Sequence, residues 1–121
     1  MIIKTLIFSV LFFSFNSLAL DLRPIDYKSK CGEDYVFCQN PEWNMEIECL
    51  IAAVRFRKLS EVCKSEVNFI KAVRSEIEKE CREHITTSCK EHEFFTPSGV
   101  NCLKSSKITS TCRTLLVLNF K

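Results

Sequence analysis

Eight cysteines are the residues whose type and spacing most constrain the chemistry of this 121-residue chain. They fall into two sets of four, spanning 31–63 and 81–112. In each set the third cysteine is followed by leucine and the fourth by a basic residue. These shared features predict one four-cysteine unit used twice, about 50 residues apart. The candidate disulfide residues are Cys31, Cys38, Cys49, Cys63, Cys81, Cys89, Cys102 and Cys112.

A repeated Cys-x-x-His pattern is the one arrangement that points to a metal. Its residues are Cys81 with His84, and Cys89 with His92. Two cysteines and two histidines suit zinc. On one helix, however, the four would spread over about 16 Å of rise, too far for a single ion. We therefore expect no metal and no cofactor.

The same residues are the only candidates for nucleophilic catalysis. His84 and His92 are the sole histidines, and an even number of cysteines leaves no thiol to spare for a Cys–His pair. The chain has neither a serine elbow nor a Cys-x-x-Cys redox pair. We therefore predict that the protein is not an enzyme.

The N-terminus is typical of an export signal. Lys4 precedes an apolar run over 5–15, and Ser17 and Ala19 are small residues where a signal peptidase cleaves. We interpret 1–19 as a signal peptide and 20–121 as a single cysteine-rich domain. The alternative, a membrane anchor, needs about 20 apolar residues, more than this run holds. Export implies an oxidising compartment, so we expect a secreted or periplasmic protein with its cysteines in disulfides.

Charge and composition exclude some classes of binding partner. The net charge of +2 provides no footprint for nucleic acid, and we expect no nucleic-acid partner. Only two glycines occur, which excludes Gly-rich phosphate loops. After signal cleavage no remaining stretch is long enough to span a membrane.

Apolar periodicity predicts helices and no sheet. From Cys63 to Cys89 apolar residues recur every three or four positions, which predicts a long helix capped by Ser60 and continuing to about residue 93. A bend at 86–88 is an alternative. Further helices are expected over 29–38, 45–58 and 100–118, with Pro97 and Gly99 breaking the chain in a loop over 94–99. The predicted fold is all-α: disulfide-stapled helical hairpins, with two four-cysteine repeats joined by a long helix.

The spacing favours a nested pairing within each repeat, although four cysteines allow three pairings. The inner cysteines would flank a turn and the outer ones would join the far ends. This gives Cys38–Cys49 inside Cys31–Cys63, and Cys89–Cys102 inside Cys81–Cys112. In the first repeat the helical rises differ, about 10.5 Å against 21 Å, so the chain must bend near Leu59 and Ser60. Each bridge should stay in its own repeat, because the intervening helix separates Cys63 from Cys81 by about 27 Å.

The aromatic residues are interpreted mainly as packing. Trp43 and the aromatics near the repeat turns are expected in the core or in packed loops, and an exposed interaction patch is the alternative. These aromatics are Tyr35, Phe37, Phe94 and Phe95.

The first repeat resembles the cysteine-rich repeat of Golgi apparatus protein 1. The resemblance rests on the cysteines, on Asp34 and Phe37 between the first two, on Leu50 after the third, and on Leu59-Ser60 before the fourth. The second repeat keeps its cysteines and Leu103 but loses the aromatic and the Leu-Ser step. The family's repeats bind growth factors and adhesion receptors in the secretory pathway. The resemblance therefore implies a small exported relative with an interaction role, and it carries over no binding residue.

These observations predict an exported, non-enzymatic, macromolecule-binding or structural module. Its expected partner is an unknown protein or glycan. Two alternatives remain: a carrier of small hydrophobic ligands, which would show a closed apolar cavity between helices, and a secreted toxin or inhibitor.

Overall fold

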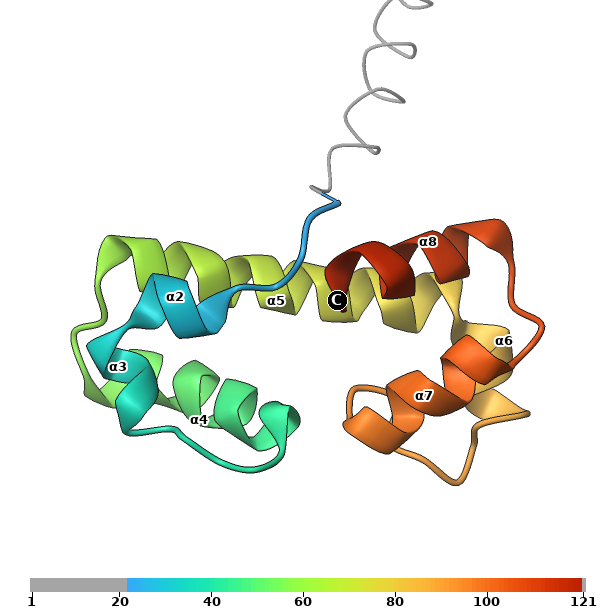
Figure 1. Ribbon diagram of the computed structural model, residues 1–121, viewed down its shortest axis with the longest axis horizontal. Coiled ribbons are helices and arrows are strands. Elements are labelled where there is room, and N and C mark those ends of the chain that lie inside the picture. The colour runs from blue at the N-terminus through green and yellow to red at the C-terminus, as the bar shows by residue number, and fades with distance from the viewer. Residues whose placement is uncertain (1–21, 121) are drawn as a thin grey trace, which may run out of the picture.

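The structure, a computed structural model, describes residues 22–120, and the proposed signal peptide over 1–19 lies outside them. This described part is helical and contains no strand (Figure 1). Its helices are α2 (Tyr27–Cys31), α3 (Glu33–Val36), α4 (Trp43–Phe56), α5 (Glu61–Glu80), α6 (Arg82–Thr86), α7 (Pro97–Ser105) and α8 (Ser110–Asn119).

Four disulfides staple the helices in the nested pattern. The outer bridges join Cys31 to Cys63 and Cys81 to Cys112, with Cα atoms 4.4 and 5.2 Å apart. The inner bridges, Cys38–Cys49 and Cys89–Cys102, have Cα separations of 5.5 and 5.9 Å. Each of the four disulfides joins two cysteines of the same repeat. The fold is therefore two stapled hairpins joined by α5.

Helix α5 belongs to both repeats. It begins two residues before Cys63, the fourth cysteine of the first repeat, and Cys81, the first cysteine of the second, is its C-cap. Helix α2 packs against α5, and α8 packs against the part of α5 nearer its C-terminal end (Figure 1). The last helix of one repeat therefore also serves as the first helix of the next.

A hydroxyl cap before the fourth cysteine occurs in both repeats. The Ser60 hydroxyl accepts a hydrogen bond from the Cys63 amide at 3.1 Å and caps α5. The Thr109 hydroxyl accepts one from the Cys112 amide at 3.2 Å and caps α8. The apolar residue before the cap is Leu59 in the first repeat and Ile108 in the second. The second repeat lacks the Leu-Ser residues themselves, as predicted from the sequence, but Ile108-Thr109 makes a similar cap.

Three predicted helices are shorter than expected. The helix predicted from Ser60 to about residue 93 ends at Glu80, because the chain turns at Cys81 (φ −103°, ψ 7°) where it is tied to α8. Helix α6 then ends where the hydroxyls of Thr86 and Thr87 donate to carbonyls of the preceding turn, at 2.9 and 2.6 Å.

The first and last predicted helices are each divided. The helix expected over 29–38 breaks at Gly32, whose φ of +50° favours glycine. The helix expected over 100–118 breaks at Ser106, which is extended, before Thr109 starts a new one.

Pro97 and Gly99 begin a helix and do not break one. Thr96 caps α7 through the Gly99 amide at 3.1 Å, and Pro97 occupies the first turn, where its missing N–H costs nothing. A Cβ on Gly99 would fall on the Glu93 carbonyl, so the close approach of the loop requires glycine.

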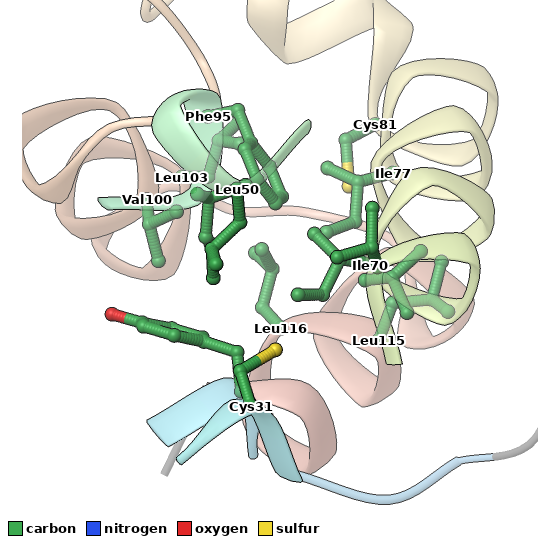
Figure 2. Packing of buried hydrophobic residues seen from close by; sticks show 14 of the residues in the cluster. Cys31, Leu50, Ile70, Ile77, Cys81, Phe95, Val100, Leu103, Leu115 and Leu116 are labelled. Atoms are coloured by element: carbon green, nitrogen blue, oxygen red, sulfur yellow. The ribbon is translucent and has the colours of Figure 1, made fainter. Parts of the chain in front are cut away.

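One apolar core runs through both repeats. Val67, Ile70, Val73 and Ile77 of α5 are each at most 1% exposed. Figure 2 shows side chains from both repeats, including Leu50 of α4 and Leu103 of α7, turned toward a common interior. An aromatic cluster joins the two repeats: the ring centroid of Trp43 lies 5.3 Å from that of Phe95 and 5.2 Å from that of Phe120.

Peptide mapping tests the pairing. Under denaturing, non-reducing conditions we expect no titratable thiol and four linked peptide pairs, each within 31–63 or 81–112. A bridge from one set to the other, or two free thiols, would contradict the fold described here.

The two caps should contribute equally. Ser60→Ala and Thr109→Ala should each lower the free energy of unfolding by about 1 kcal/mol, because each leaves a first-turn amide without its acceptor. Urea denaturation at constant pH measures this. Ser65→Ala, at an exposed position inside α5, is the matched control and should change stability by less than about 0.5 kcal/mol. An equal loss in all three variants would rule out a capping role.

Candidate functional site

A pocket of about 470 Å³ lies between the two repeats and opens to solvent. Its walls come from the segment 25–28, the beginning of α4, most of the length of α7, and the end of α8 with Phe120. The segments are distant in sequence, and the fold brings them together because α2 and α8 both pack on α5. A backbone hydrogen bond from the Ile25 amide to the Asn119 carbonyl, at 3.1 Å, joins two of these walls.

Several residues of the pocket lining are apolar. Trp43, the only tryptophan of the chain, and Phe120 line it together with Ile25, Ile47 and Val100. Phe95 and Phe120 pack against the indole of Trp43, so its position is fixed.

Polar residues complete the lining. Lys104 of α7 is half-buried and its Nζ donates to the Phe120 carbonyl at 3.2 Å. Lys28, Asp26 and Asn101 also line the pocket. Asn119 is 1% exposed; its Nδ2 donates to the Leu115 carbonyl at 2.8 Å, while its Oδ1 has no donor among the described residues.

A buried carboxylate holds the start of α2. Glu46 of α4 is 2% exposed and accepts from the Tyr27 hydroxyl at 2.6 Å and from the Asn40 amide at 3.1 Å. Burial alone would raise the pKa of Glu46, but these hydrogen bonds outweigh it and hold the pKa below its ordinary value. Burial and the neighbouring carboxylate raise the pKa of Tyr27. Tyr27 therefore stays protonated and keeps donating to Glu46.

A second buried carboxylate anchors the segment before α2. Glu66 of α5 is 1% exposed and pairs with both terminal nitrogens of Arg23, at 2.6 and 3.1 Å. The Asp26 amide donates to it at 2.7 Å. Burial again acts to raise the pKa of Glu66, and the Arg23 and Asp26 contacts lower it below its ordinary value. Sequence patterns did not identify either glutamate, since nothing distinguishes a buried glutamate from the exposed ones on the same helices.

The residues of the Cys-x-x-His pattern do not form a metal centre in the described part of the chain. Cys81 is bonded to Cys112 and Cys89 to Cys102, so both sulfurs are used in disulfides. His84 lies in α6, half-buried, while His92 is exposed in the turn that follows. Residues 22–120 hold no group of three or more potential ligands of this kind.

The aromatic residues divide into packed and exposed ones. Phe95 is 5% exposed, and Trp43, Tyr35 and Phe94 pack partly against the core, as predicted. The prediction was wrong for Phe37, whose side chain is 69% exposed. The guanidinium carbon of Arg57 lies 3.8 Å from the centroid of the Phe37 ring, a cation–π contact.

A second exposed aromatic of the same repeat precedes Arg57 in the chain. Phe56, at the end of α4, is 83% exposed, and Arg57, which follows it, covers Phe37. We call this surface the Phe37–Phe56 face; it consists of Val36, Phe37, Arg55, Phe56, Arg57 and Lys58, all exposed. Sequence reasoning missed Phe56.

The cysteine spacing held a signal for this face. The third and fourth cysteines are 14 positions apart in the first repeat and 10 in the second. The C-cap residues of α4 and α7 are Arg57 and Ser106, and they stand at the same distance before the fourth cysteine of their repeats. The four extra residues therefore lengthen α4 by about one turn, and Phe56 belongs to that turn.

Comparisons of the chain with protein-family models, curated proteins and solved structures find no match. Within residues 22–120, no helix combines the length and the apolar character needed to cross a membrane.

Acid should destabilise the protein through Glu46 and Glu66. Because both folded-state pKa values are lowered, their contribution is complete above the unfolded value of about 4.3 and is lost as the pH falls below it. We expect the free energy of unfolding to stay level from pH 7 to about 5 and then to fall. Glu66→Gln should cost about 2 kcal/mol at pH 7 and flatten this acid limb.

Urea denaturation from pH 7 down to pH 3 measures this effect. Glu61→Gln is the control, since Glu61 is 89% exposed in its pair with Lys64 and should change neither quantity appreciably. An acid limb as steep in Glu66→Gln as in the unchanged protein would contradict the role given to Glu66.

Proposed function

We propose that this protein is an exported, non-enzymatic binding module that uses its first repeat to contact another macromolecule. Four disulfides in 99 described residues fit an extracellular or otherwise oxidising compartment. We also propose that it is a small relative of the Golgi apparatus protein 1 repeats. The Leu59-Ser60 step of the first repeat supports this relationship, and Ile108-Thr109 makes a similar cap in the second repeat.

The Phe37–Phe56 face is the observation that carries the proposal. Val36, Phe37 and Phe56 are each more than half exposed. An apolar partner that covered them would remove their surface from water, and full burial of each side chain would contribute about 1.5–3 kcal/mol to binding. Aromatic and arginine side chains are also the residues that contribute most at protein interfaces. The second repeat, in which the corresponding helix is a turn shorter, has no matching aromatic pair.

The charges of the face specify the kind of partner. Arg55 precedes Phe56, and Arg57 and Lys58 follow it. Of these three, only Arg57 forms an ion pair with a carboxylate of residues 22–120, Asp34 at 3.8 Å. A protein surface with an apolar centre and an acidic rim complements this arrangement. A glycan partner is the alternative outcome of the experiment below.

Non-enzymatic action is part of the proposal. His84 and His92 lie in different elements, and the cysteine nearest each is in a disulfide. A turnover that depends on either histidine would contradict it.

The pocket does not match the cavity expected for a carrier of small hydrophobic ligands. The pocket between the repeats is open and partly lined by polar residues, whereas a carrier of apolar ligands was expected to enclose a closed apolar cavity. No feature of the described residues favours the toxin or inhibitor alternative.

Co-purification with matched baits tests the proposal. From the native exported fraction, the unchanged protein should retain a partner that Phe56→Ser loses by at least tenfold, because that change removes the centre of the face. Val117→Ser is the control: Val117 is also exposed, 47%, but lies on α8 of the second repeat. Retention by this control and loss with Phe56→Ser would support the proposal, and equal retention by all three baits would contradict it. Elution by glycosidase treatment would identify the partner as a glycan.

A further inference from the structure

We propose that the pocket between the repeats binds a small amphipathic anion, a molecule with an aliphatic or aromatic body and one carboxylate or sulfonate group. This site is separate from the Phe37–Phe56 face and does not depend on it. None of the six residues that form the face lines the pocket.

The size and the apolar lining residues of the pocket suit the body of such a ligand. Its volume of about 470 Å³ falls within the range usual for small-molecule sites. Trp43 and Phe120 pack against each other and line the pocket together with Val100, so a hydrocarbon chain or ring would lose its contact with water there.

The charged residues of the lining favour a negative group. Two lysines, Lys28 and Lys104, line the pocket, against one carboxylate, Asp26. The half-buried ammonium of Lys104 donates to a neutral carbonyl, and none of the carboxylates in residues 22–120 forms an ion pair with it. An ammonium has three N–H donors, so two remain for an anionic ligand at a place where water screens the charge only partly.

The walls are held in place before any ligand arrives. Glu66 fixes the segment 23–26, Glu46 fixes Tyr27, and the aromatic cluster fixes Trp43. A ligand would therefore not have to order these segments, and its contacts would appear largely as affinity.

The single tryptophan makes the site directly observable. Trp43 lines the pocket, so binding there should change its fluorescence. Decanoate is the probe, used below its micelle concentration with the disulfide-bonded protein at pH 7. Decanol and decyltrimethylammonium, which share its chain but are neutral and cationic, are the comparison compounds.

Decanoate should produce saturable quenching or a shift in Trp43 emission, and decanol and the cation should bind at least fivefold more weakly. Lys104→Gln should weaken decanoate binding about tenfold, because it removes a positive charge from the lining. It should leave decanol binding unchanged. Asn101→Phe places a ring at an exposed position that lines the pocket and should abolish binding without unfolding the protein, as far-UV circular dichroism will show.

Two controls locate the effect. Lys107→Gln removes an exposed charge outside the pocket, and Phe56→Ser removes the centre of the other face; both should bind decanoate as the unchanged protein does. The proposal is overturned if decanoate leaves Trp43 emission unchanged, or if Asn101→Phe binds normally. It is also overturned if decanol or the cation binds as tightly as decanoate. Loss of binding with Phe56→Ser would assign the site to the Phe37–Phe56 face instead.

Discussion

The two outer disulfides fix everything else in this molecule, because they join other helices to the two ends of α5. Cys31–Cys63 ties the end of α2 to the beginning of α5, and Cys81–Cys112 ties the end of α5 to the beginning of α8. A chain of this size has a marginal core, and closing loops of 32 and 31 positions removes conformational entropy that the core would otherwise have to offset. Once α2 and α8 are held on α5, the short inner helices have only small regions left in which to pack.

The buried carboxylates of Glu46 and Glu66 also hold the helices together, through polar contacts instead of covalent bonds. Burying a charge is unfavourable unless it is paired or hydrogen-bonded. Glu66 is paired with Arg23 and accepts from the Asp26 amide, and Glu46 accepts from the Tyr27 hydroxyl and the Asn40 amide. The segment before α2 is too short to contribute much apolar area, so directional contacts replace packing. Glu66 ties this segment to α5, and Glu46 ties Tyr27 to α4, so the contacts fix one wall of the pocket.

Much of the fold follows from the sequence, and the failures have identifiable causes. Cysteine spacing and the apolar stripe of α5 predicted helices, a bend at Leu59-Ser60 and the nested pairing. Helix ends were predicted less well: the stripe continues through Ile85 and Cys89 although the backbone turns at Cys81, because a covalent bond to α8 overrides helical periodicity. Pro97 and Gly99 were interpreted as helix breakers. Their role in starting α7 becomes apparent only from the structure, in which Thr96 caps the helix and the Glu93 carbonyl packs against Gly99. The pocket was not predictable, because its walls come from four segments with no common motif, and the exposure of Phe37 depends on which side of the inner disulfide it occupies.

The sharing of α5 has a consequence for how such a chain arises and divides. Equivalent cysteines recur after about 50 residues, and this period places the boundary between copies within a continuous helix, where no linker exists. Cleavage of the chain in a loop cannot give two complete repeats. The repeat that is separated from α5 also loses the cysteine at its end of α5, Cys63 or Cys81, to which its own outer cysteine is bonded. Duplication in this architecture therefore creates an overlapping array, in which one helix must satisfy the packing of two neighbours. Substitutions at the middle of that helix, around Val73, are constrained from both sides at once.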